Sequence, residues 1–185
     1  EFTDFTKFVQ LSVNDYIALK KDGEIKKKGD FSTEFELHKN KSRKIVPLAL
    51  EQYFIHNTPP EETIRKHNNI FDFCIGAKSS KNFHYEGVKK TTGEVVKYNK
   101  LIRYYISTEG EKLYKIKNEG VETNAPQVRE CEADIPYQTV FNKAWKSENM
   151  EDYKIDYDYY IKKTYDIIHK IEPKPKTLKN QLTLF

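Results

Sequence analysis

The end of the chain limits what the rest of it can fold into. Residues 172–180 contain two prolines and three lysines, a composition that keeps a segment extended and outside a packed core. The chain then closes on Gln181-Leu182-Thr183-Leu184-Phe185, an apolar pentapeptide at the end of this linker. We therefore expect the folded part to end near residue 171 and the pentapeptide to be presented to a partner.

Simple energetics indicate how such a peptide would act. Leu182, Leu184 and Phe185 would each contribute roughly 1.5–3 kcal/mol if a partner buried them. Ordering the backbone costs about 1–2 kcal/mol per residue, so the isolated contact is weak. A tether compensates by raising the effective concentration of the peptide to about millimolar. The alternative is that the terminal Leu and Phe fold back onto the domain.

Composition narrows the class of protein. A chain of 185 residues suits one domain, or one domain with an appendage. Cys74 and Cys131 show no metal-ligand spacing, so we expect free thiols in a reducing compartment. The sequence has no signal peptide and no apolar run near 18 residues. These features predict a soluble cytoplasmic protein without a membrane partner.

Periodicity and turn signals predict an α+β fold. Strands are expected at Lys7–Ser12 and Asp15–Lys20, and a hairpin turn at Asp22-Gly23 leads into Glu24–Lys28. Helices are expected after Pro47 and after Thr58, which would cap its helix. An amphipathic helix is expected from Asp156 to Ile171, because its apolar residues recur every three or four positions.

The middle of the chain predicts a small antiparallel meander. Its four strands would be Phe83–Lys89, Glu94–Lys97, Lys100–Ser107 and Lys112–Lys117, with turns at Gly93 and Glu109-Gly110. The run Ile70–Ile75 is short and apolar, and its type is undecided. Residues 119–136 are expected to be irregular.

Two resemblances point to DNA replication. The closing pentapeptide resembles the Gln-Leu-(Ser/Asp)-Leu-Phe motif with which bacterial replication proteins bind the sliding clamp, and this implies clamp-binding roles for Gln181, Leu182, Leu184 and Phe185. Asp158-Tyr159-Tyr160-Ile161, at the start of the last helix, resembles the segment that closes the thumb of family-B DNA polymerases. The hairpin from Tyr16 to Gly29 resembles the strand pair at the palm–thumb junction of that family.

Together these motifs, in this order, make the chain similar to the C-terminal third of replicative polymerases from phages of gut bacteria. The resemblance implies the end of a palm in residues 1–31, a thumb-like domain in 32–171 with its β meander at about 83–117, and a linker with a clamp-binding tail in 172–185. It also implies binding of primer-template DNA and of a bacterial sliding clamp, in the cytoplasm of a bacterial host. Since the chain opens on Glu1, we expect that it continues upstream.

The chain departs from the family in two respects. Asn14-Asp15 stand where a double lysine usually precedes the junction tyrosine. The catalytic carboxylates of the family lie on upstream palm motifs, including a Tyr-x-Asp-Thr-Asp hairpin, that these residues lack. Two-metal phosphoryl transfer needs at least two such carboxylates. We therefore expect no catalytic residue, metal site or cofactor in this chain, and Mg²⁺ only in the upstream palm of a parent polymerase.

Basic residues are the candidates for holding DNA. Residues 20–44 contain nine Lys or Arg against five acids, and such cations suit phosphate oxygens. The predicted DNA-binding residues are Tyr16, Lys26, Lys27, Lys28, Lys39, Lys41, Arg43 and Lys44. The alternative is that lysine-rich strands are solvated edges that resist aggregation.

Three functions follow from these patterns. The first is a processivity-conferring, non-catalytic part of a template-directed DNA polymerase. The second is a stand-alone accessory module that binds DNA and the clamp without enzymatic activity. The third is an unrelated α+β interaction domain whose terminal Leu and Phe only pack against it.

Overall fold

The structure is a computed structural model that describes residues 5–32, 43–132, 135, 137–141 and 147–172. Contacts divide the chain into two compact units. The first comprises residues 1–34, 44–67 and 157–185, and the second comprises residues 35–43 and 68–156. The N-terminal strands thus share a unit with the helices, whereas the meander belongs to the other. The expected functional division at residues 31 and 171 stays a prediction.

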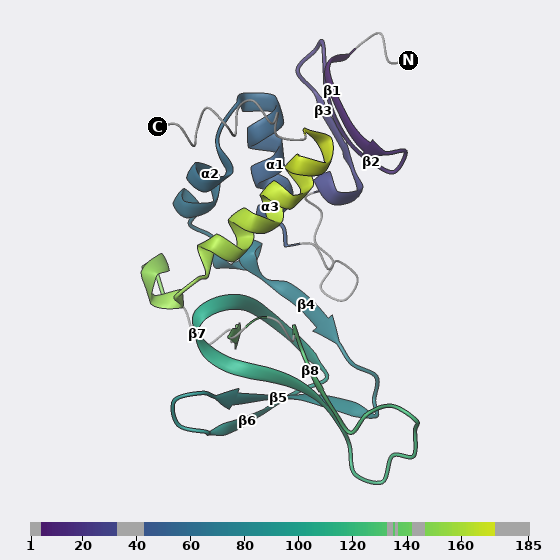
Figure 1. The fold of residues 1–185 in the computed structure, drawn as a ribbon, viewed down its shortest axis with the longest axis vertical. Coiled ribbons are helices and arrows are strands. Elements are labelled where there is room, and N and C mark those ends of the chain that lie inside the picture. The colour runs from purple at the N-terminus through teal and green to yellow at the C-terminus, as the bar shows by residue number, and fades with distance from the viewer. Residues whose placement is uncertain (1–4, 33–42, 133–134, 136, 142–146, 173–185) are drawn as a thin grey trace, which may run out of the picture. The chain divides into compact units, whose positions relative to one another are not determined.

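The first unit contains a three-stranded antiparallel sheet. Its strands are β1 (Phe5–Ser12), β2 (Asp15–Lys20) and β3 (Ile25–Lys28), in the order β1-β2-β3 (Figure 1). The turn between β2 and β3 is at the predicted Asp22-Gly23, where Gly23 has a φ of 90°. The backbone N–H of Lys20 donates to the Glu24 carbonyl over 2.8 Å and closes the hairpin. The predicted hairpin is confirmed.

Helices complete the first unit. They are η2 (Gly29–Phe31), α1 (Ile45–His56), α2 (Pro60–Lys66) and α3 (Tyr157–Ile171) (Figure 1). The start of α1 lies two residues before Pro47, which occupies the first turn. Thr58 was expected to cap α2, and this is wrong. Pro59 holds the cap position without a side-chain hydrogen bond, while the Thr58 N–H donates to Gln52 at the end of α1.

The core of the first unit lies around α1. The helix buries residues on most of its surface, because α2, α3 and η2 all contact it. On α3, the residues Tyr160, Thr164 and Ile168 are fully or almost fully buried, at the spacing of four that the sequence predicted. Tyr165 of α3 also donates a hydrogen bond to Glu61 of α2 over 2.8 Å. The predicted amphipathic helix is therefore confirmed.

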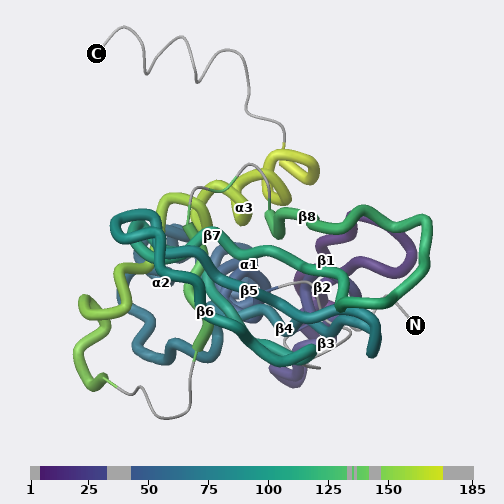
Figure 2. The backbone as a smooth tube through the Cα atoms, turned by 90° about the horizontal axis from the view of Figure 1, so that it is seen from below, coloured from purple at the N-terminus to yellow at the C-terminus, as the bar shows by residue number. Residues whose placement is uncertain are grey.

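The second unit is a larger antiparallel sheet with two short helices. Its elements are η3 (Ile70–Phe73), β4 (Ile75–Lys78), β5 (Phe83–Lys89), β6 (Val95–Tyr98), β7 (Leu101–Lys117), β8 (Val128–Glu130), β9 (Gln138–Val140) and η4 (Met150–Tyr153). The strand order is β4-β7-β5-β6, and β8 and β9 also pair with β7. Figures 1 and 2 show β7 running through this unit with β5 and β6 beside it. The undecided run Ile70–Ile75 becomes η3 followed by the start of β4.

One long strand replaces two predicted ones. The expected turn at Glu109-Gly110 is wrong, since β7 continues through it for 17 residues. Gly110 has a φ of 140°, and Ile106 and Glu111 both align with Gln138 of β9. Gly110 therefore lies at an irregularity within one continuous strand, where β7 has four more residues than β9 between consecutive pairs. The strand β8 also contradicts the expectation that residues 119–136 are irregular throughout.

These units confirm an α+β fold with a helix at the C-terminal end of its described part. Among the described residues, no helix is long and apolar enough to cross a membrane.

Candidate nucleic-acid interface

The register of the three-stranded sheet decides which lysines lie together. Lys28 pairs with Tyr16, and Lys26 pairs with Ala18, so these residues share one face of the sheet. Lys27 pairs with Ile17, which has no exposed surface. Side chains alternate along a strand, so Lys27 lies on the opposite face from its two neighbours. The three consecutive lysines therefore do not form one patch.

Helix α1 covers the face that carries Lys27. The Lys27 ammonium forms an ion pair with Glu51 of α1 at 3.4 Å. From β1, Lys7 donates to the carbonyls of Phe54 and Ile55 over 3.3 and 3.2 Å, near the C-terminal end of the same helix. A cation at this helix end interacts favourably with the helix dipole. This face of the sheet is thus an internal surface of the first unit.

An aromatic pair lies with Lys26 and Lys28 on the other face. Phe8 of β1 pairs with Ala18, in the same row as Lys26. Its ring is stacked with that of Tyr16 at a centroid distance of 5.9 Å, and Phe8 is 39% exposed. We call Phe8, Tyr16, Lys26 and Lys28 the lysine–aromatic face. Its two cations can meet phosphate oxygens, while its rings can contact sugars or bases.

A turn at the end of β3 holds this register. Asp15, the first residue of β2, accepts hydrogen bonds from the Asp30 N–H over 2.9 Å and from the Ser12 hydroxyl over 2.8 Å. Gly29 has a φ of 67°, and a Cβ there would lie 1.8 Å from the Asp15 Oδ1 atom. Only glycine fits this turn. Asp15, part of the departure from the double-lysine pattern, is therefore a structural residue of the hairpin.

Burial raises the pKa of Asp30 above its ordinary value of 3.8, and the nearby Asp15 carboxylate raises it further. The positive charge of Lys170 opposes both effects. The polar end of the hairpin therefore holds two carboxylates close together, one of them hydrogen-bonded to the backbone.

The remaining predicted DNA-binding residues are not part of this face. Arg43 belongs to the second unit, where it forms an ion pair with Glu132 at 2.7 Å and its side chain is only 11% exposed. Lys44 precedes the first residue of α1. Lys39 and Lys41 lie outside the described residues, as do the predicted clamp-binding residues Gln181, Leu182, Leu184 and Phe185.

Several tyrosines belong to the cores of the two units. Tyr104, Tyr105, Tyr153 and Tyr160 are each at most 5% exposed. Within the segment that resembles the polymerase thumb, Tyr160 is in the core and Asp158 forms an ion pair with Arg65 of α2 at 2.8 Å. This segment therefore attaches α3 to the first unit.

The cysteines and the potential metal ligands were also compared with the predictions. Both cysteines are free, as predicted, and burial raises the pKa of Cys74 to about 12 and that of Cys131 to about 11. Neither is a thiolate at neutral pH, so neither is an activated nucleophile. No group of three or more His, Cys, Asp or Glu suited to a metal ion occurs among the described residues.

Phe8 belongs to the lysine–aromatic face but was not predicted from the sequence. Its place beside Tyr16 depends on the register between β1 and β2, which is irregular at both ends of the pairing. The only local signal was the alternation of exposed and half-buried residues that β1 shows.

Comparison with family models, with curated proteins and with solved structures gave no match that would show the family of this chain.

Proposed function

We propose that this chain is the DNA-gripping, non-catalytic C-terminal region of a phage-like, template-directed DNA polymerase. It binds the backbone of primer-template DNA and, through its tail, a bacterial sliding clamp. The observation that carries this proposal is the lysine–aromatic face, which combines Lys26 and Lys28 with the stacked Phe8 and Tyr16 rings. Three of its residues, Tyr16, Lys26 and Lys28, lie in the hairpin that resembles the palm–thumb junction.

Such a face suits contact with DNA irrespective of base sequence. Lysine ammonium groups neutralise phosphates and release counterions, so the affinity falls as salt rises. The rings can lie against sugars without reading the bases. The contribution of the chain to polymerisation is then a lower rate of dissociation from the primer-template, rather than chemistry at the reacting nucleotide.

The tail would add to this effect. The sequence Gln181 to Phe185 resembles a clamp-binding motif, and its linker would keep a released polymerase close to DNA. Deleting these five residues should abolish binding to a bacterial clamp and leave the melting temperature unchanged. A fall in melting temperature without any loss of clamp binding would instead support the fold-back alternative.

The grip is tested by paired charge removal. In fluorescence anisotropy with a primer-template duplex, K26A/K28A should weaken binding and lower the slope of log affinity against log salt by about 1.8, or 0.9 per phosphate contact. The control K66A/K162A removes the same charge from exposed lysines of α2 and α3 in the same unit. Equal affinities and slopes for the two variants would overturn the assignment.

The polymerase part of the proposal has a separate test. The reading frame upstream of Glu1 should continue into palm motifs with paired catalytic carboxylates. A start codon directly before Glu1 would favour the accessory module, for which the same DNA and clamp tests apply.

A further inference from the structure

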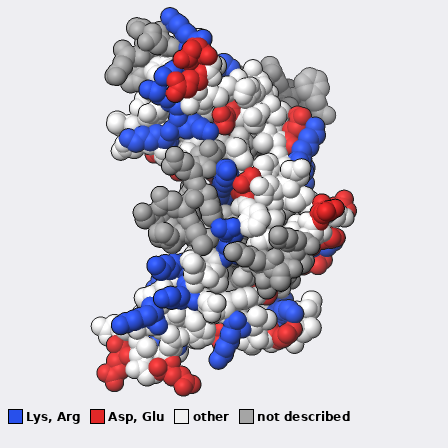
Figure 3. Space-filling view, turned by 180° about the vertical axis from the view of Figure 1, so that it is seen from behind, with Lys and Arg blue, Asp and Glu red and all other residues white. Residues whose placement is uncertain are grey.

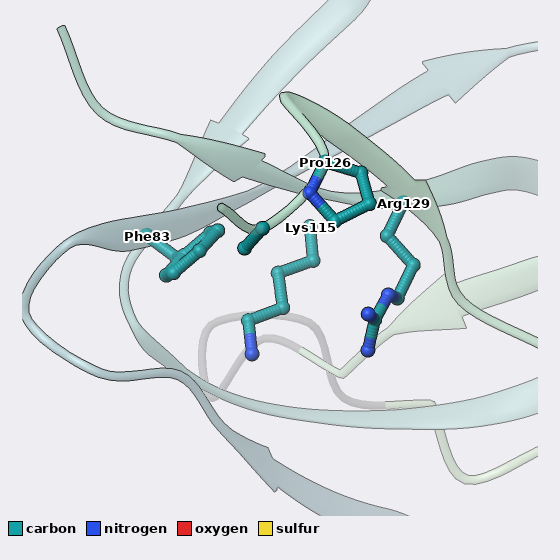
Figure 4. Close-up of a pocket in the computed structure, with 5 residues that line it drawn as sticks. Phe83, Lys115, Pro126 and Arg129 are labelled. Atoms are coloured by element: carbon teal, nitrogen blue, oxygen red, sulfur yellow. The ribbon is translucent and has the colours of Figure 1, made fainter. Parts of the chain in front are cut away.

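A second cationic site lies in the second unit and is made of other residues than the proposed grip. A pocket of about 170 Å³ is lined by Phe83, Lys115, Ala125, Pro126 and Arg129. Figure 4 shows the side chains of Lys115 and Arg129 extending side by side in the same direction, with Phe83 and Pro126 around them. Two cations and two apolar rings thus face one small space.

The two cations repel each other unless an anion lies between them. Lys115 of β7 and Arg129 of β8 are directly opposite in the pairing of these strands, and like charges in that position destabilise a sheet. The neighbouring carboxylate of Glu130 pairs with Lys112 and so does not neutralise them. Among the described residues, neither Lys115 nor Arg129 has a carboxylate partner. The Lys115 ammonium instead lies 4.8 Å from the centre of the Phe83 ring.

The surrounding strands add to the positive charge. Residues 78–117 contain ten Lys or Arg against four Glu, and Lys and Arg side chains gather over part of this unit in the view of Figure 3. The exposed Lys81 lies two residues before Phe83. A strand with several phosphates could therefore contact further cations as it leaves the pocket.

We infer that this pocket binds a phosphate of a single nucleic-acid strand, between Lys115 and Arg129, with the attached sugar or base against Phe83 and Pro126. An Arg and a Lys side by side suit phosphate oxygens, and an aromatic ring beside them suits an unstacked nucleotide. The volume holds a phosphate with part of a nucleotide, and is below the roughly 300–1,000 Å³ of pockets for larger ligands. The inference does not rest on the proposed function, because none of these residues belongs to the first unit.

The test is binding of a fluorescein-labelled octathymidine strand to the full chain, followed by anisotropy. K115A/R129A should raise the Kd about tenfold or more, since both cations that contact the phosphate are lost. The control K66A/K162A removes two exposed lysines from α2 and α3 of the first unit and should change the Kd by about twofold or less. No loss in K115A/R129A, or an equal loss in the control, would overturn the inference.

Competition identifies the recognised group and its source. Where the monophosphate competes, it should displace the strand more effectively than thymidine, which lacks the phosphate; displacement by thymidine at the same concentration as by thymidine monophosphate would overturn the inference. If the monophosphate displaces the strand at its own low affinity, the pocket accepts the phosphate of a free nucleotide as well. If only a longer strand competes, the pocket recognises phosphates within a strand.

Two further variants keep the test independent of folding and of the proposed grip. F83L keeps an apolar side chain but removes the ring, and it should raise the Kd about fivefold with the melting temperature nearly unchanged. K115Q/R129Q repeats the charge removal with longer side chains, should the alanine variant fold poorly. Binding of octathymidine should survive in K26A/K28A, so failure of the pocket and failure of the duplex grip are distinguishable.

Discussion

In each of the two sheets, a carboxylate oxygen lies next to a glycine, in the space that the Cβ atom of any other residue would fill. The surroundings of the two carboxylates differ. In the first unit, Asp15 lies against Gly29 at the polar end of the hairpin and accepts a backbone hydrogen bond. In the second unit, Glu111 lies under Gly87 within the sheet, where it is 8% exposed and accepts both of its hydrogen bonds from Tyr98.

Both sheets are rich in lysine, but one has an exposed face and the other has a pocket. The first sheet packs one face against α1 and leaves the lysine–aromatic face directed outward. The second sheet buries residues such as Tyr85 and Leu113, and its contact site is a pocket lined from β5, β7, β8 and the segment before β8. Asp15 thus lies at the end of a hairpin with an exposed face, whereas Glu111 is itself buried.

The largest expected effect is at Gly29. In G29A the new Cβ meets both the Asp15 carboxylate and the Asn14 carbonyl oxygen, which would be 2.4 Å away. A left-handed backbone adds about 1–2 kcal/mol, so we expect the free energy of unfolding to fall by about 3 kcal/mol. Urea denaturation measures this change.

Gly93 provides the control for Gly29. Its φ of 70° is nearly the same, but no atom lies within 4 Å of a Cβ built there. G93A should therefore cost only the backbone term, about 1 kcal/mol. If G29A and G93A lower the free energy of unfolding by the same amount, the clash with Asp15 contributes nothing. The comparison of the two sheets is then wrong for the first unit.

The second expected effect is at Gly87. A Cβ in G87A would lie 2.0 Å from the Glu111 Oε2 atom, so the carboxylate must leave the Tyr98 hydroxyl. We expect a loss of about 2 kcal/mol in the free energy of unfolding, from overpacking and from the broken hydrogen bonds. Because the clash is with one side chain, G87A should cost about 1 kcal/mol less in an E111A background. An unchanged cost would mean that another neighbour is responsible.

These contacts also show what the sequence could and could not predict. The helix at residues 157–171 and the first hairpin were predicted because a long 3.6-residue period and an Asp-Gly turn are local signals. The continuation of β7 through Gly110 was not predicted. In the sequence, a glycine at an irregularity of a strand opposite β9 cannot be told from a glycine in a turn. Nor could a run of three lysines show that Lys27 faces α1, because its face depends on pairing with β2. Of the four residues of the lysine–aromatic face, the sequence therefore indicated Tyr16, Lys26 and Lys28 but not Phe8.

A third prediction uses the alternation of Lys26 and Lys27. K27A leaves the poorly exposed Glu51 carboxylate without its ion-pair partner, so we expect a loss of about 1 kcal/mol in stability and little change in affinity for duplex DNA. K26A should change stability by less than about 0.5 kcal/mol and should weaken DNA binding. Thermal unfolding and anisotropy on both variants measure the two effects. The reverse pattern would show that the face of the sheet away from α1 is not the one that binds DNA.

The smallest expected effect is the pH dependence at Asp30. Its pKa is raised in the folded state, so the folded protein holds this proton more tightly than the unfolded chain does. The resulting stabilisation is full below the ordinary pKa of 3.8 and is lost as the pH rises through the higher folded value. D30N cannot ionise, so its stability relative to wild type should rise across this window and then stay constant. Urea denaturation of both proteins between about pH 3 and pH 6 measures the difference. A difference that falls as the pH rises would mean that the attraction of Lys170 outweighs burial and the repulsion from Asp15.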